Sequence, residues 1–130
     1  MRNTVTLIIL MVMAVITGCT PKPDVALIDF KSQTVDIGYI KPNSRPVNVT
    51  FSITNNGGKA LQLHNVASDC SCAVASYTKK PIAAGDTGSI NIKLDPKLIS
   101  AKGHYERPIV VHSNTKPRLH TLIIKMFVDR

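Results

Sequence analysis

The sequence predicts an all-β fold, an antiparallel β-sandwich of about seven strands. Apolar and polar residues alternate with a period of two along most of the chain beyond residue 26, which is typical of strands with one buried and one solvated face. Turn-forming residues separate these runs at short intervals. No segment carries a helical stripe except a short turn around residues 96–101.

The clearest strand lies at residues 47–54, and shorter alternating runs lie at 61–63 and 90–94. Turn signals stand between them, at 41–44, 55–58, 84–86 and 114–117. Seven or eight such strands within about 100 residues predict a sandwich of immunoglobulin type. The Cys…Trp…Cys pattern of antibody domains is absent because the chain has no Trp, so the expected likeness concerns architecture alone.

The last run, residues 119–128, is apolar on both of its faces. Ile123 and Phe127 lie on the second face of this run. We therefore expect this strand to be covered on both sides or to lie at a contact surface, with these two side chains as the candidate protein contact.

The N-terminus predicts a lipoprotein signal peptide over residues 1–18. Arg2 is followed by an unbroken apolar stretch at residues 7–16, which is too short for a spanning helix. Residues 15–19, Val-Ile-Thr-Gly-Cys, resemble the bacterial lipobox. This resemblance implies a diacylglycerol and an N-acyl lipid on Cys19, which would anchor the mature chain to a membrane.

Residues 19–26 form a Pro-rich polar tether, and residues 27–130 form the domain. Thr20, rather than Asp, follows the lipidated cysteine, and no acidic pair follows. These features favour the outer membrane, with the domain facing the periplasm.

Motifs in the domain resemble a bacterial family of unknown function, DUF1573, over residues 27–128. The matching segments are the strand and turn Val47 to Gly58, Asp69-Cys70-Ser71-Cys72, Pro81 to Asp86, Gly103 and Ser113-Asn114. Ser71 replaces the usual central Gly, and Lys125-Met126 stands where a Gly commonly follows. The resemblance implies an immunoglobulin-like module of secreted and lipid-anchored proteins, with no established activity.

Cys70 and Cys72 are the one pair that could carry chemistry. In an extended strand their Cα atoms would be about 6.5–7 Å apart, so a disulfide needs a local kink, which Ser71 makes costlier than Gly would. An oxidising periplasm favours the bridge, and a strained bridge is comparatively reducible. The alternatives are a structural disulfide at the end of the sandwich, a redox pair, or a site for a soft metal such as Cu(I).

A zinc site would need two further ligands from the four histidines, His64, His104, His112 and His120. His104 and His112 share one strand, but eight residues at about 3.3 Å separate them by roughly 26 Å. They cannot bind one ion together, and we expect no metal and no cofactor beyond the lipid.

Composition argues against an enzyme and against a nucleic-acid partner. The eight acidic residues are scattered, and no phosphate-binding loop is present. The formal net charge is +8, and the compartment makes lipid head groups or an anionic envelope polymer the available polyanions. The basic residues that gather in loops and late strands are Lys79, Lys80, Lys97, Lys102, Arg107, Lys116, Arg118 and Lys125.

Together these features predict a non-enzymatic, lipid-anchored envelope protein that acts as a binding or assembly module. An exposed strand edge could pair with a partner's strand. The alternative is a thiol-redox or copper-handling protein that uses Cys70 and Cys72.

Thiol trapping with intact mass and metal analysis of the protein from its native envelope separates these two functions. We expect a fully oxidised Cys70–Cys72 pair that resists mild reductant, as a structural module requires. Free thiols, a readily reduced bridge or bound copper would instead move the function onto the two cysteines.

Overall fold

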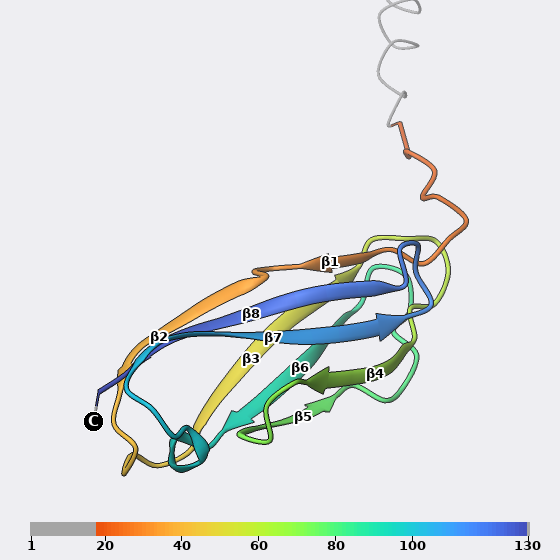
Figure 1. Ribbon diagram of the computed structural model, residues 1–130. Helices are drawn as coiled ribbons and strands as arrows, with labels where there is room; N and C mark the ends of the chain where they lie inside the picture. Colours follow the sequence, from red (N-terminus) through yellow and green to blue (C-terminus); the bar gives the residue numbers. More distant parts are fainter. Residues whose placement is uncertain (1–17, 130) are drawn as a thin grey trace, which may run out of the picture.

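The alternating runs form two four-stranded sheets that pack face to face (Figure 1). The computed structural model describes residues 18–129. The strands of the first sheet are, in spatial order, β1 (Ile28–Phe30), β3 (Val47–Asn55), β6 (Thr87–Leu94) and β5 (Ala73–Tyr77). Those of the second are β2 (Thr34–Ile40), β8 (Leu119–Val128), β7 (Gly103–Ser113) and β4 (Leu63–Ser68). A short 3₁₀ helix, η1 (Pro96–Leu98), joins β6 to β7.

The predicted all-β sandwich is confirmed, but the predicted count of about seven strands is too low. The described part of the chain forms eight, because its N-terminal segment divides between the two sheets. β1 pairs antiparallel with β3, and β2 then pairs parallel with β8. Residues 31–33 connect β1 in the first sheet to β2 in the second, so this segment forms two strands. The pairing of β2 with β8 is the parallel one.

Aliphatic side chains on the inward faces of both sheets build the core. In β3, Val49, Phe51 and Ile53 are buried, whereas the polar residues between them face outward, as the alternation predicts. Burying each such side chain stabilises the fold by about 1.5–3 kcal/mol. The other sides of the core come from β6, β7 and β8, through Ile90, Ile92, Leu94, Ile109, Val111, Leu122, Ile124, Met126 and Val128.

Strand β8 lies between β2 and β7, so both of its edges already carry hydrogen bonds. Its second face, with Ile123 and Phe127, is half-buried on the outside of the sheet. A partner would therefore reach these residues through the face of the sheet and not by strand pairing with β8. The outermost strands are β1 and β5 in the first sheet and β2 and β4 in the second. Between β5 and β4, the Tyr77 hydroxyl donates a hydrogen bond to the His64 carbonyl (2.9 Å).

The connections divide between the two ends of the sandwich (Figure 1). The β3–β4, β5–β6 and β7–β8 connections lie where the tether enters, and we call this the tether end. The β2–β3, β4–β5 and β6–β7 connections lie at the opposite, far end with the C-terminus. Across residues 18–129 there is no helix with the length and apolar character needed to cross a membrane.

Asn55, the last residue of β3, is fully buried and joins three segments at the tether end. Its Nδ2 donates hydrogen bonds to the carbonyl oxygens of Lys59 (2.7 Å) and Ile82 (2.9 Å). Its Oδ1 accepts the backbone N–H groups of Gly57 (3.0 Å) and Leu27 (3.4 Å). The amide thus uses both of its donors and both of its acceptor sites.

We expect Asn55→Ala to lower the free energy of unfolding by about 2–4 kcal/mol, because it leaves buried backbone groups without partners. Asn56→Ala is the matched control, since Asn56 is exposed and its side chain makes one hydrogen bond, to Asp29 (3.1 Å). We expect that control to cost less than about 1 kcal/mol. Urea unfolding of both variants measures the difference, and equal losses would contradict the role of the buried amide.

Candidate functional site

Three aromatic rings stand in a row across the outer face of the second sheet. Tyr39 of β2 and His104 of β7 are the Cα partners of Phe127, which lies between them on β8. The ring centroids of Tyr39 and Phe127 are 5.0 Å apart, and those of His104 and Phe127 are 4.7 Å apart. These distances are typical of favourable tilted and edge-to-face aromatic pairs.

A bulge in β2 places Tyr39 in this row. Asp36 pairs with Lys125 and Tyr39 pairs with Phe127, so β2 has one more residue than β8 between these two pairs. Gly38 adopts a positive φ of 70° at the bulge, a conformation that favours glycine, and its N–H donates to Asp36 Oδ1 (2.8 Å). Tyr39 is 80% exposed beside its partner.

Charged groups flank the rings. Lys125 Nζ and Glu106 Oε1 form an ion pair at 2.9 Å on the same face. The hydrogen bond that Lys125 donates to Glu106, and then the charge of Glu106, raise the pKa of Lys125 above its ordinary value, so the ammonium stays charged. Asp36 also borders the groove. The groove encloses about 520 Å³ and combines an apolar aromatic floor with a polar rim, a composition that suits binding.

The structure brings one of the two predicted contact residues, Phe127, into this aromatic groove. Ile123 lies on the same strand face, but it pairs with Thr34 and Pro108, four residues along β8 from Phe127. Tyr39 and His104 are contacts that sequence reasoning missed. They lie beside Phe127 only because β2 and β7 pair with β8. The alternation of residues along a single strand does not predict which distant strands will pair.

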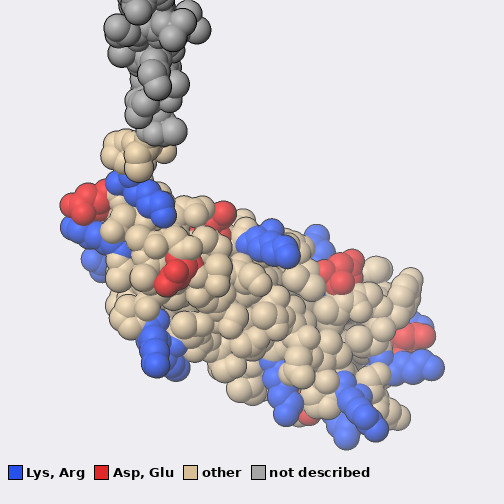
Figure 2. Space-filling view, turned by 180° about the vertical axis from the view of Figure 1, so that it is seen from behind, with Lys and Arg blue, Asp and Glu red and all other residues tan. Residues whose placement is uncertain are grey.

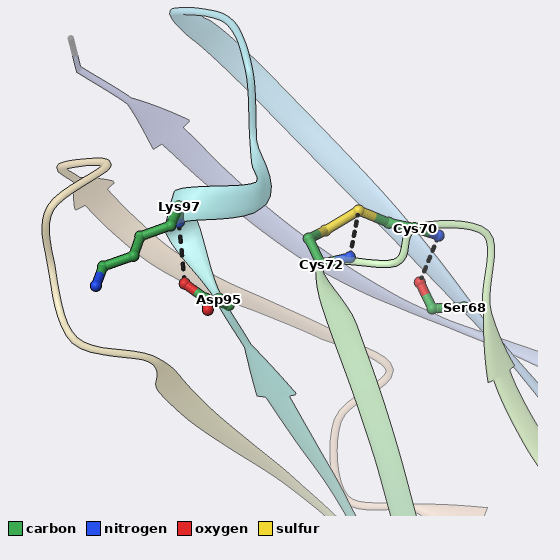
Figure 3. Close-up of a disulfide and its surroundings, with 5 residues drawn as sticks. All are labelled: Ser68, Cys70, Cys72, Asp95 and Lys97. Atoms are coloured by element: carbon green, nitrogen blue, oxygen red, sulfur yellow. Dashed lines mark hydrogen bonds between the residues drawn. A yellow bond between two sulfur atoms is a disulfide. The ribbon is translucent and has the colours of Figure 1, made fainter.

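Cys70 and Cys72 form a disulfide in a turn between β4 and β5 (Figure 3). This turn supplies the local bend that a bridge between two residues so close in sequence requires. The N–H of Ala73 donates to the Cys70 carbonyl (3.2 Å), which closes a tight turn and brings the two Cα atoms to 5.1 Å. The chain already bends here, so the bridge needs no kink inside a strand.

Hydrogen bonds hold this turn against its surroundings (Figure 3). The Cys70 N–H donates to Ser68 Oγ (3.2 Å), and the Cys72 N–H donates to Cys70 Sγ (3.1 Å). The Asp95 N–H donates to the Cys72 carbonyl (2.7 Å), and the Asp95 carboxylate caps η1 by accepting the Lys97 N–H (3.0 Å). The disulfide turn and η1 therefore form one unit at the far end.

The two sulfur-bearing residues differ in accessibility. Cys72 is 1% exposed and belongs to the hydrophobic core, whereas Cys70 is half-buried and packs against it. Packing of this kind suits a bridge that closes the far end of the core. An attacking thiolate could approach the Cys70 sulfur more readily than the Cys72 sulfur.

The four histidines lie in three separate places. His64 of β4 and His112 of β7 have ring centroids 5.1 Å apart, and His104 belongs to the aromatic groove. His120 packs on Phe30 at 5.5 Å. Among residues 18–129, no three His, Cys, Asp or Glu side chains gather in an arrangement that could hold a metal ion.

The His64–His112 pair was not anticipated from the sequence. A register shift between Leu63 and Asn65 in β4 places His64 beside its partner, and local alternation does not report such a shift. Gln62 and Asn114, just beyond the pair, link β4 to the β7–β8 turn through the Gln62 N–H to Asn114 Oδ1 bond (2.9 Å).

The predicted signal peptide falls outside the described part of the chain except for Gly18. Cys19, the predicted lipidation site, is exposed with a free thiol. The second half of the tether already lies on the domain: Ala26 is buried, and the carbonyls of Pro23 and Val25 accept hydrogen bonds from Gly58.

The chain belongs to the DUF1573 family, described as proteins of unknown function, whose model matches residues 28–128. No relative was found among curated protein sequences.

Solved structures share the fold at low sequence identity. A protein of unknown function from Porphyromonas gingivalis W83 is 18% identical with a TM-score of 0.71, over 86% of this chain and 51% of that one. The ASH/PapD-like domain 7 of human CEP192 is 12% identical (TM-score 0.59; 88% and 92% covered), and the E. coli chaperone DraB is 14% identical (0.51; 79% and 55%). This chain thus spans about half of the first structure, and such identities show the fold alone.

Burial, partly opposed by a hydrogen bond with the Pro117 backbone, lowers the pKa of His120 below its ordinary value. The unfolded chain then binds the proton more tightly than the folded one, so stability falls as the pH drops through about 6.5. We expect the free energy of unfolding of His120→Gln to fall less steeply between pH 7.5 and 5.5 than that of the parent protein. The control variant His104→Gln, which keeps His120, should show the parent's decline. Urea unfolding between pH 7.5 and 5.5 measures both, and an unchanged slope in His120→Gln would contradict the assignment.

Proposed function

We propose that this DUF1573 protein is a lipid-anchored envelope protein whose sandwich is a non-enzymatic binding or assembly module. The lipid is carried on Cys19, and the outer membrane holds the protein with its domain toward the periplasm. The aromatic groove is the surface that contacts a protein partner.

The observation that carries this proposal is the exposed aromatic row across β2, β8 and β7. Tyr39 is 80% exposed in the protein alone. An aromatic side chain of this size stabilises a complex when a partner buries it, so its exposure indicates a binding surface. Tyrosine surrounded by a polar rim is a common centre of binding energy in protein interfaces. The Lys125–Glu106 pair on the rim supplies charge for selecting and orienting a partner.

Two further features support a module of assembly. The fold is shared with the E. coli chaperone DraB, and a chaperone acts by binding another protein, which is the kind of role proposed for this module. The outermost strands β1, β2, β4 and β5 each have an edge with no neighbour in their own sheet, where a partner's strand could pair. Of these, β2 also carries Tyr39, so a partner strand beside it would lie next to the aromatic groove.

A photoreactive phenylalanine analogue placed at Tyr39 in the native host tests the surface. We expect irradiation to give a discrete adduct with one envelope protein. The same analogue at Thr50, which is exposed on β3 of the opposite sheet, is the matched control and should give none. Identical adduct patterns from both positions, or no adduct from Tyr39, would contradict the proposal.

The double variant Cys70→Ala/Cys72→Ala separates this function from the thiol alternative. The disulfide lies in the β4–β5 turn, and neither cysteine lines the aromatic groove. If the groove is the binding surface, the Tyr39 adduct persists in the double variant. Its loss from a variant that remains folded would favour a function that depends on the two cysteines.

A further inference from the structure

We propose that the tether end of the sandwich lies against the anionic head groups of the membrane that holds the anchor. This inference rests on the lipid anchoring of Cys19 proposed above. It adds a second membrane contact, made by the basic loops of the domain, and thereby sets the orientation of the sandwich on the bilayer.

The tether is short enough to bring this end to the membrane surface. The Pro23 carbonyl already accepts the Gly58 N–H at 2.7 Å, and the Val25 carbonyl accepts it at 3.0 Å. Only residues 20–22 therefore separate Cys19 from the first residue bonded to the domain. Four fully extended steps span at most about 14 Å, so a lipid on Cys19 holds the tether end within that distance of the bilayer.

Close backbone packing keeps the tether on this end. A Cβ atom at Gly58 would stand 2.6 Å from the Pro23 carbonyl oxygen, so no larger residue fits there without a shift. Lys59 also pairs with Asp24 of the tether, with Nζ and Oδ2 3.3 Å apart. The tether thus enters the sandwich at a defined place and not as a free linker.

The loops around this entry point are basic. Among the described residues, the tether and the three tether-end connections carry six exposed basic side chains and two acidic ones, Asp24 and Asp86. Asp29 of β1 lies nearby, within hydrogen-bond distance of Asn56. Figure 2 shows basic side chains around the point where the chain enters the sandwich. The six basic residues are Lys22, Lys59, Lys79, Lys80, Lys116 and Arg118.

The far end differs in its charge balance. Its connections and the last described residue carry four basic and three acidic side chains, so their charges nearly cancel. Lys102 is also paired with Asp129 at 2.9 Å. The basic residues are Lys41, Arg45, Lys97 and Lys102, and the acidic ones are Asp69, Asp95 and Asp129.

Hydrogen bonds between the tether-end loops hold the basic side chains on one surface. The Gly85 N–H donates to the Asn55 carbonyl (2.7 Å), and Gln62 Nε2 donates to the Lys79 carbonyl (3.0 Å). The Asn114 N–H donates to the Gln62 carbonyl (3.1 Å). Charges are screened over about 8 Å at physiological salt, so a charged membrane attracts mainly the end that the anchor brings close.

Lysine labelling of the lipidated, full mature protein on vesicles tests this contact. Intact mass first establishes that Cys19 carries lipid. The protein is then inserted into vesicles of phosphatidylcholine alone or with about one third phosphatidylglycerol, and each lysine is acetylated briefly and quantified by mass spectrometry. We expect Lys59, Lys79, Lys80 and Lys116 to react severalfold more slowly on the anionic vesicles, and Lys97 and Lys102 to react equally on both.

Charge-reversal variants provide the matched comparison. Lys79→Glu/Lys80→Glu/Lys116→Glu should abolish the protection of Lys59, whereas the far-end variant Lys41→Glu/Arg45→Glu/Lys97→Glu should keep it. All six positions are exposed, so both variants are expected to fold. About 0.5 M salt should remove the protection in the parent protein.

The outcomes separate this inference from the anchoring on which it rests. Suppose that the protein is lipidated but its tether-end lysines react equally on both kinds of vesicle, or that Lys59 stays protected in the tether-end charge-reversal variant. Either result overturns the proposed membrane contact and leaves the lipid anchoring intact. Protein without lipid on Cys19 overturns the anchoring and this inference with it.

Discussion

The buried amide of Asn55 is the interaction on which the tether end depends. It joins the start of the domain at Leu27, the β3–β4 turn at Gly57 and Lys59, and the β5–β6 connection at Ile82. A buried amide is stabilising only when all its hydrogen bonds are made, so these segments are constrained together. The place where the tether meets the sandwich follows from this constraint, and so does the surface on which the basic loops gather.

Three surfaces of the sandwich then have separate properties. The tether end is basic, the far end is closed by a disulfide turn packed onto η1, and the outer face of the second sheet carries the aromatic groove. The groove lies on the outer face of the second sheet, toward the end opposite the tether. A basic tether end held on a membrane would therefore leave the groove facing away from the bilayer. The proposed binding and membrane contacts are therefore compatible in one molecule.

Much of the fold could be predicted from the sequence because a strand's alternation is a local property. Residues 47–54, 90–94 and 119–128 lie within β3, β6 and β8, and the Pro96–Leu98 turn is helical as expected. The strand count was too low because β1 and β2 join different sheets, which depends on partners far away in the chain. The turn that brings Cys70 and Cys72 together is closed by a hydrogen bond from the Ala73 N–H, which alternation along the chain does not report.

The sequence by itself determined which residues alternate, where turns interrupt them, how basic the chain is and that Cys70 and Cys72 are two residues apart. Only the tertiary structure decided that Tyr39 and His104 flank Phe127, because one ring arrives by parallel pairing through a bulge and the other by antiparallel pairing. It also decided that basic loops distant in sequence share one end. Local patterns follow from the chain's own neighbours, whereas a binding surface arises from segments that only the folded sheets bring together.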